Sequence, residues 1–204
     1  MTQRLRDSFA AIMMTLVSLS GVFVEAADAP APARNTPESV RKYWLLPPPA
    51  GDGVVERGEW LFRQKGCFLC HGPAGQGGVP NHNYIRETVP RLSPAELMKL
   101  EETEDVLAIL EHLTRRQPLD SLVDAPPVPR YEVVLGQYHS IQSLIQTGRK
   151  PGKKNAKGPV PPLKMPSWRR ELSAADIDAI IAYLLHTRHQ EESRATAENA
   201  ASAP

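Results

Sequence analysis

The sequence predicts an all-α domain, and three observations lead to this prediction. Several segments repeat apolar residues at helical spacing, no segment alternates apolar and polar residues as a half-buried strand does, and glycine- and proline-rich stretches separate the segments. Only 6% of the 204 residues are aromatic and 20 are proline, so side-chain burial offers limited stabilisation to a small domain. A bound group is therefore expected to contribute to the core.

About five helices are expected, and their N-termini carry capping signals. The helices are predicted at residues 54–64, 93–100, 103–113, 131–147 and 173–189. Ser93 precedes Glu96 by three positions, as Ser173 precedes Asp176, which is typical of a capping box. Thr103 is expected to cap the third helix. All five helices together fit a single folded domain over residues 54–189.

The N-terminus has the pattern of a secretory signal peptide. Arg4 and Arg6 precede an uncharged apolar stretch over residues 9–24, and small residues around position 26 fit a cleavage site. The stretch is shorter than the roughly 20 residues of a spanning helix, although a retained membrane anchor is the alternative. The signal peptide is therefore assigned to residues 1–26, and the domain is expected in the periplasm or otherwise outside the cytoplasm.

Two further segments flank the predicted domain. Residues 27–53 are rich in proline and alanine and are expected to form an extended linker. Residues 190–204 are polar and rich in alanine, and a disordered tail is expected there.

The residues that carry chemistry are Cys67, Cys70 and His71 in the string Cys-Phe-Leu-Cys-His. Two thiols one helical turn apart can add to the two vinyl groups of a haem, while the following imidazole binds the iron. A disulfide is the alternative for a lone pair of cysteines in an exported protein, but the strand–helix alternation of a thioredoxin-like domain is missing. A zinc site would need two more ligands at suitable spacing, and none is found. We therefore predict one covalent haem c.

Two groups of residues give the chain a resemblance to the class I cytochromes c. Residues 58–62 (GEWLF) and 66–72 (GCFLCHG) resemble that family's first helix and haem-attachment site. Residues 164–168 (KMPSW) and 172–184 resemble its methionine-ligand loop and last helix. The resemblance covers about residues 54–188 and implies the cytochrome c fold around one haem, with electron transfer as the activity.

The resemblance also implies roles for individual residues. His71 would be the proximal iron ligand and Met165 the distal ligand, which leaves the iron without an open site. Pro80, in the segment Val-Pro-Asn, would accept a hydrogen bond from His71 through its carbonyl oxygen. Phe62 would meet Tyr183 where the first and last helices cross, with glycine at position 58 permitting the close approach.

The residues themselves also favour Met165, because a thioether is a ligand for haem iron and this methionine lies in a predicted loop. Met98 is the competing methionine, but it lies in an amphipathic helix where a core role is expected. His82, His112 and His139 are the candidates if both axial ligands are histidines.

The middle of the chain departs from the compact family pattern. His71 and Met165 are separated by 94 positions, and the additional length contains the apolar helical segments around Val106 and Val134. This helical insertion leaves three functions to compare. They are a free electron carrier, an electron-entry subunit of a larger oxidoreductase, and a haem enzyme or gas sensor with an open sixth position.

Charge gives one indication about partners. The formal net charge of +1 offers no argument for nucleic acid, and none is expected to bind. Between Arg149 and Arg170, however, there are eight basic residues and no acidic one. This run brackets Met165, and it is expected either to orient redox donor and acceptor proteins with acidic surfaces or to be a solvated loop.

Overall fold

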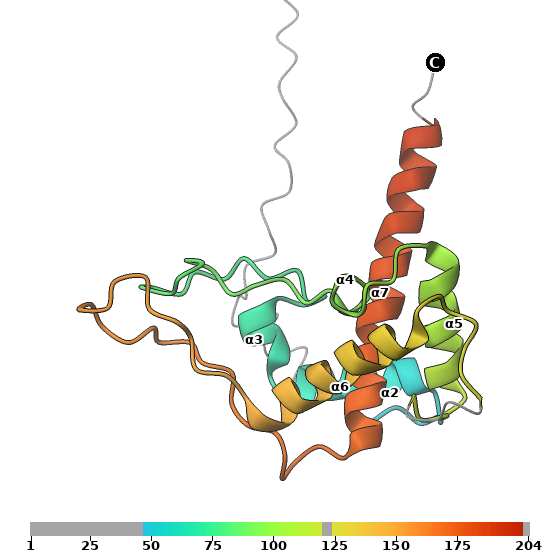
Figure 1. Cartoon of the computed structure of the whole chain (residues 1–204), viewed down its shortest axis with the longest axis horizontal. Coiled ribbons are helices and arrows are strands. Elements are labelled where there is room, and N and C mark those ends of the chain that lie inside the picture. The colour runs from blue at the N-terminus through green and yellow to red at the C-terminus, as the bar shows by residue number, and fades with distance from the viewer. Residues whose placement is uncertain (1–46, 120–123, 202–204) are drawn as a thin grey trace, which may run out of the picture. The chain divides into compact units, whose positions relative to one another are not determined.

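The computed structural model describes residues 47–119 and 124–201, which belong to one compact unit of the chain. The helices of these residues are α2 (Val54–Gln64), α3 (Cys67–His71), α4 (Pro94–Met98), α5 (Thr103–Thr114), α6 (Tyr131–Thr147) and α7 (Ala174–Ala201) (Figure 1). The described residues contain isolated β-bridges and no strands, so the all-α prediction is confirmed. The predicted signal peptide and most of the predicted linker lie outside the described residues.

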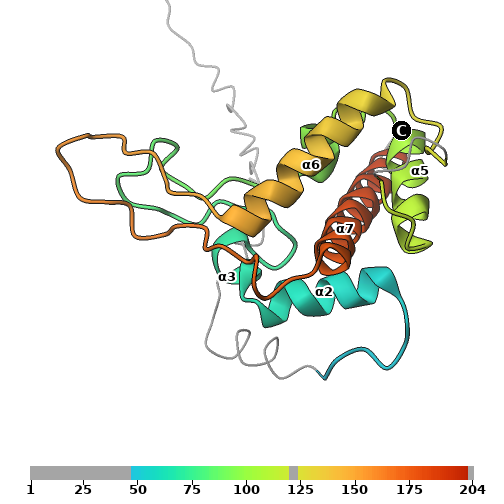
Figure 2. The same cartoon turned by 60° about the horizontal axis from the view of Figure 1, so that its bottom comes forward.

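The helices α2 and α7 cross each other (Figure 2), and Gly58 lies at their contact. A Cβ atom at Gly58 would lie 1.8 Å from the carbonyl oxygen of Ala179 and 2.9 Å from the Cβ of Tyr183, so only glycine fits. Phe62, fully buried one turn further along α2, stacks at a tilt on Tyr183 with ring centroids 5.6 Å apart. The predicted contact between the first and last helices is therefore confirmed.

The two helices of the predicted insertion extend this core. α5 packs on α7, whereas α6 packs mainly on α4, which in turn contacts α7. Ile109 of α5 is fully buried, as is almost all of Tyr138 of α6, whose hydroxyl donates to the carboxylate of Asp178 on α7. The insertion is thus part of one continuous hydrophobic core and is not a separate domain.

The capping predictions have mixed outcomes. Ser173 and Asp176 form the expected box at the start of α7, because each backbone N–H donates to the other side chain, at 3.0 and 3.2 Å. Partial burial raises the pKa of Asp176, but the hydrogen bonds from Ser173 and the nearby Arg57 together lower it by more, so its pKa lies below the ordinary value. Ser93 is the N-cap residue of α4, as predicted, but its side chain makes no cap bond. The prediction for Thr103 is wrong, because Glu102 is the N-cap residue and Thr103 is the first helical residue of α5.

The C-terminal prediction also needs correction. Residues 190–201 were expected to be disordered, but α7 continues through them to Ala201 (Figure 1). They are rich in strong helix formers, and ion pairs fix the first turn of the extension. Arg188 pairs with Glu192 at i,i+4, and Arg91 reaches Glu191 from outside the helix. Polarity of the segment therefore did not distinguish an exposed helix from a disordered tail.

No helix among the described residues is both long enough and apolar enough to cross a membrane, and this includes the 28-residue α7.

The crossing at Gly58 can be tested with Gly58→Ala. The added methyl group would overlap the backbone of Ala179, so we expect the free energy of unfolding to fall by about 1–3 kcal/mol. Gly136→Ala is the matched control, because Gly136 lies in α6 with open space around it, and alanine should stabilise that helix by up to about 1 kcal/mol. Denaturant unfolding measures both. Equal effects of the two substitutions would contradict the close crossing.

Candidate haem site

A single helical turn presents the attachment residues. α3 (Cys67–His71) is flanked by Gly66 and Gly72, which have positive φ angles of 70° and 78°. These left-handed positions favour glycine and let the chain turn sharply on both sides of α3. Because α3 starts almost directly after α2, the α2–α7 crossing fixes the position of Cys67, Cys70 and His71 relative to the core.

Both thiols of this turn are unpaired and partly buried. Burial raises the pKa of Cys67 to about 11 and also raises the pKa of Cys70. The two groups are therefore neutral thiols near pH 7, unlike the low-pKa thiolate of a redox-active dithiol. Free thiols on one turn fit thioether attachment to a haem better than they fit redox catalysis.

His71 is held in the orientation that an iron ligand needs. Its Nδ1 lies 3.2 Å from the carbonyl oxygen of Pro90, which can only accept, so Nδ1 carries the proton and Nε2 keeps its lone pair. Burial lowers the pKa of His71 and outweighs the Pro90 hydrogen bond, which raises it. The ring is therefore held neutral, and a neutral imidazole with a bonded Nδ1–H is the form that binds metals.

The carbonyl that accepts from His71 belongs to Pro90 and not to Pro80, so the prediction for Pro80 is corrected. Residues 79–89 form a hairpin-like loop, which we call the 79–89 loop, and its two arms run antiparallel. The backbone N–H of Val89 donates to the carbonyl of Val79 at 2.8 Å, and Pro80 lies opposite Thr88. Pro80 therefore lies in the 79–89 loop, and the chain contacts His71 at Pro90, after that loop.

The sequence offers Pro90 as a second candidate but does not select it. The dipeptide Val-Pro occurs at the start of the 79–89 loop and again at its end, as Val89-Pro90, and the second copy precedes Pro94 and the start of α4. Which copy faces His71 depends on pairing between the two arms. That pairing is a long-range property that local spacing does not reveal.

Gly77 allows the chain to pass beside Pro90. Its backbone N–H donates to the carbonyl of His71 at 2.8 Å. A Cβ atom at Gly77 would lie only 2.5 Å from the backbone nitrogen of Arg91 and 2.7 Å from the carbonyl carbon of Pro90. Gly77 is therefore another residue of the site that the sequence did not indicate.

Met165 lies in the connection between α6 and α7. This connection contains the 149–165 loop, whose two ends meet: the N–H of Arg149 donates to the carbonyl of Met165 at 3.0 Å, and the N–H of Met165 to that of Arg149 at 3.1 Å. Gly148 permits the approach, since a Cβ there would lie 2.6 Å from the carbonyl oxygen of Met165. Met165 itself is partly exposed and belongs to no helix.

The other candidate ligands have different surroundings. Met98 is fully buried in the hydrophobic core, as expected for a packing residue. His112 is buried on α5 with its Nε2 3.3 Å from the carbonyl oxygen of Pro118, whereas His82 and His139 are exposed. Within the part of the chain that the structure describes, no group of three or more His, Cys, Asp or Glu residues could hold a metal ion by itself.

The all-α core presents two free thiols and a neutral imidazole on one turn, and this is the arrangement expected of the haem-attachment site of a c-type cytochrome. The comparison with protein families agrees, because residues 55–127 match the family model for cytochrome c. The chain therefore carries a class I c-type cytochrome domain, binds haem c covalently and takes part in haem-based electron transfer. No curated protein and no solved structure matches the chain significantly.

The family match includes Cys67, Cys70, His71 and Pro90 and ends before α6. Met165 and α7 therefore lie outside it. The role of Met165 as a ligand therefore rests on the sequence resemblance and is a proposal.

The role of Gly77 can be tested with Gly77→Ala, which should displace Pro90 and weaken its hydrogen bond to His71. Such a bond contributes on the order of 1 kcal/mol and makes the imidazole a stronger donor to ferric iron, so we expect the reduction potential to rise by a few tens of millivolts. Gly78→Ala is the control, because Gly78 also has a positive φ but has nothing within 4 Å of the added Cβ. An equal potential in the two variants would argue against the contact.

Proposed function

We propose that this chain transfers single electrons in the periplasm or another extracytoplasmic compartment, with His71 and Met165 as the axial iron ligands. The observation that carries the proposal is the neutral ring of His71, whose Nδ1 is bonded to Pro90 and whose Nε2 remains for the metal. The bound haem supplies a one-electron ferric–ferrous couple. The signal-like sequence at residues 1–26 supports export.

The surrounding residues support an electron carrier in which both axial positions are filled. Hydrogen bonding to Pro90 fixes the tautomer and the plane of His71. A thioether is a weak, soft ligand that raises the reduction potential, and Met165 occupies a loop tied to the end of α6, as a ligand from a second segment requires. With two protein ligands the iron would exchange electrons and would bind small molecules poorly.

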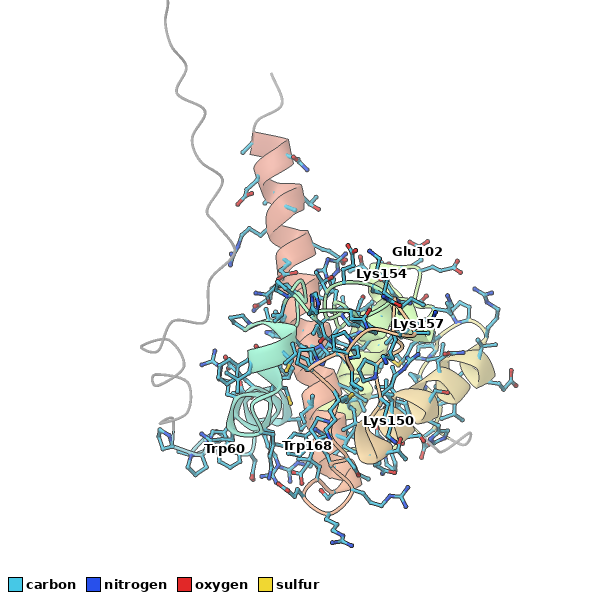
Figure 3. The ribbon with its side chains drawn as sticks, turned by 90° about the vertical axis from the view of Figure 1, so that its left-hand side faces the viewer. Trp60, Glu102, Lys150, Lys154, Lys157 and Trp168 are labelled. Carbon is cyan, nitrogen blue, oxygen red and sulfur yellow. The ribbon has the colours of Figure 1, made fainter. Side chains whose placement is uncertain are left out.

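The basic run supports docking of a redox partner with an acidic surface. Its eight cationic side chains, Arg149, Lys150, Lys153, Lys154, Lys157, Lys164, Arg169 and Arg170, are all exposed. Lys150, Lys154 and Lys157 all project from the 149–165 loop (Figure 3). Such a concentration of positive charge attracts an acidic partner and orients it before contact. Lys154 is partly compensated by an ion pair with Glu87.

The ligand assignment predicts the behaviour of Met165→Ala. The variant should lose the sulfur-to-iron charge-transfer band of the ferric protein, and its potential should fall by at least roughly 60 mV, a tenfold change in the redox equilibrium. Met98→Leu, a volume-conserving change in the core, should leave both properties as they are. An unchanged potential in Met165→Ala would point to a histidine ligand, and a high-spin spectrum of the unmodified protein would favour an enzyme or sensor.

The docking proposal predicts the effect of charge on electron-transfer rates. In Lys150→Glu/Lys157→Glu, we expect reduced protein to react with ferricyanide, an anion, several-fold more slowly at low salt, and with a cationic ruthenium ammine complex faster. Arg194→Glu/Arg188→Glu, on the C-terminal part of α7, is the control with the same change in net charge. If the control variant changes the rates as much, the basic run does not direct the approach.

A further inference from the structure

Two segments that are far apart in the sequence are joined side by side near the site. The 79–89 loop and the 149–165 loop run together in both views (Figures 1 and 2). Tyr84 pairs with Lys153 in an antiparallel bridge, and the N–H of Ile85 donates to the carbonyl of Gly152 at 3.0 Å. The backbone therefore links the loop that follows the attachment motif to the loop that ends at Met165.

Asn81 makes the contact between these loops that is nearest to Met165 in the sequence. Its side chain is 3% exposed and uses both ends of its amide on one residue: Nδ2 donates to the carbonyl of Leu163 at 3.0 Å, and Oδ1 accepts from the N–H of Leu163 at 3.0 Å. Leu163 lies two positions before Met165. The Asn81 side chain thus pairs with the backbone of Leu163, two residues before Met165, in the way that the backbone of a neighbouring β-strand would.

The backbone of Asn81 is itself fixed. Its N–H donates to the carbonyl of Glu87 at 2.7 Å, and its carbonyl accepts from Tyr84 at 3.0 Å. The side chain is short, so a fixed backbone leaves it little freedom, and the two hydrogen bonds to Leu163 are held in place. Among side chains, only an amide offers a donor and an acceptor in this arrangement.

The same loop is anchored next to the proximal ligand. The N–H of Gly78 donates to the carbonyl of Val89 at 2.9 Å, which is directly before the residue that accepts from His71. Hydrogen bonds and the short backbone segments between them therefore connect His71, through Pro90 and the 79–89 loop, to Asn81 and from there to Leu163. The supports of both proposed axial ligands meet in this one loop.

We propose that Asn81 is a positioning residue that holds the Met165 segment against the iron. This inference rests on the proposed His71–Met165 ligation and extends it. Arg149 pairs with the backbone of Met165 from one side, and Asn81 fixes Leu163 from the other, so the methionine is held between two anchored points. Loss of Asn81 would leave the polar backbone of Leu163 without these partners and allow the segment to move.

The chain offers a matched control at Asn83. This residue also joins the two loops, with Nδ2 donating to the carbonyls of Asn155 and Pro159 at 3.1 and 2.6 Å and Oδ1 accepting from Asn155 at 2.8 Å. Its contacts lie further from Met165 in the sequence than those of Asn81. Loosening the loops in general and releasing the methionine segment can therefore be separated.

The test is imidazole binding to the ferric holoprotein, because imidazole can bind the iron only where Met165 has left it. Asn81→Ala should tighten the apparent imidazole affinity roughly tenfold, since weaker methionine binding enlarges the population open to imidazole by that factor. Its methionine–iron band should weaken, and the Leu163 amide should exchange hydrogen faster. Asn83→Ala should keep the imidazole affinity and the band of the unmodified protein. Asn81→Asp, which keeps the acceptor and loses the donor, should move in the same direction as Asn81→Ala and serves if that variant does not fold.

Met165→Ala, measured beside these variants, separates the two ways of failing. If Met165→Ala leaves imidazole binding unchanged, the proposed ligation is wrong. If Met165→Ala tightens imidazole binding while the Asn81 variants do not, the ligation stands and the role of Asn81 is overturned. Equal shifts in the Asn81 and Asn83 variants would also overturn it, because they would show a general effect of joining the loops.

Discussion

At Gly58 the backbone of α2 comes so close to Ala179 of α7 that no side chain fits between them. The other elements of the site depend on this contact. α3 follows α2 almost directly, so the crossing fixes where Cys67, Cys70 and His71 lie, while α7 supplies the surface on which α5 packs. The stacking of Phe62 on Tyr183 and the ion pair between Arg57 and Asp176 act across the same interface. One glycine thus determines how the two ends of the domain meet.

Segments beyond α3 also contribute to the site. They are held by hydrogen bonds of the backbone and of asparagine side chains, and not by helices. Pro90, the 79–89 loop and the 149–165 loop contain no regular element, and they are ordered by polar contacts of high sequence separation. Such contacts gain little until the loops between them have closed, so they depend on the helical core being formed first. Haem attached covalently at α3 would add a large apolar surface to the domain, consistent with the low aromatic content of the chain.

The sequence predicted those features that depend on local spacing. Helical periodicity located the starts of the five predicted helices and the ends of four of them to within a few residues, and the string around Cys67 identified the cofactor. The family resemblance placed Phe62 beside Tyr183. The resemblance assigned the wrong acceptor, Pro80, for the His71 hydrogen bond, because the two Val-Pro dipeptides are locally equivalent. Only the pairing of Val79 with Val89 selects Pro90. The capping signals placed Ser93 correctly as the N-cap residue but not its side-chain bond, and they placed the N-cap of α5 one residue too late, at Thr103 instead of Glu102. Asn81 gave no signal, because a polar residue beside proline is typical of a turn and its partner lies 82 positions away.

The 149–165 loop has two proposed roles that require opposite properties. Docking favours many exposed cations, which repel one another over the roughly 8 Å screening length at physiological salt, whereas a ligand segment must keep one conformation. The structure divides these demands along the loop. Asn83 and the Lys154–Glu87 pair order the lysine-rich end, and Asn81 and Arg149 order the end at Met165. Since buried or uncharged contacts are screened less than exposed charges, the hold of Asn81 on Leu163 should be nearly independent of salt, while docking should weaken as salt rises. The position of the methionine and the attraction of a partner are therefore controlled by different interactions within one loop.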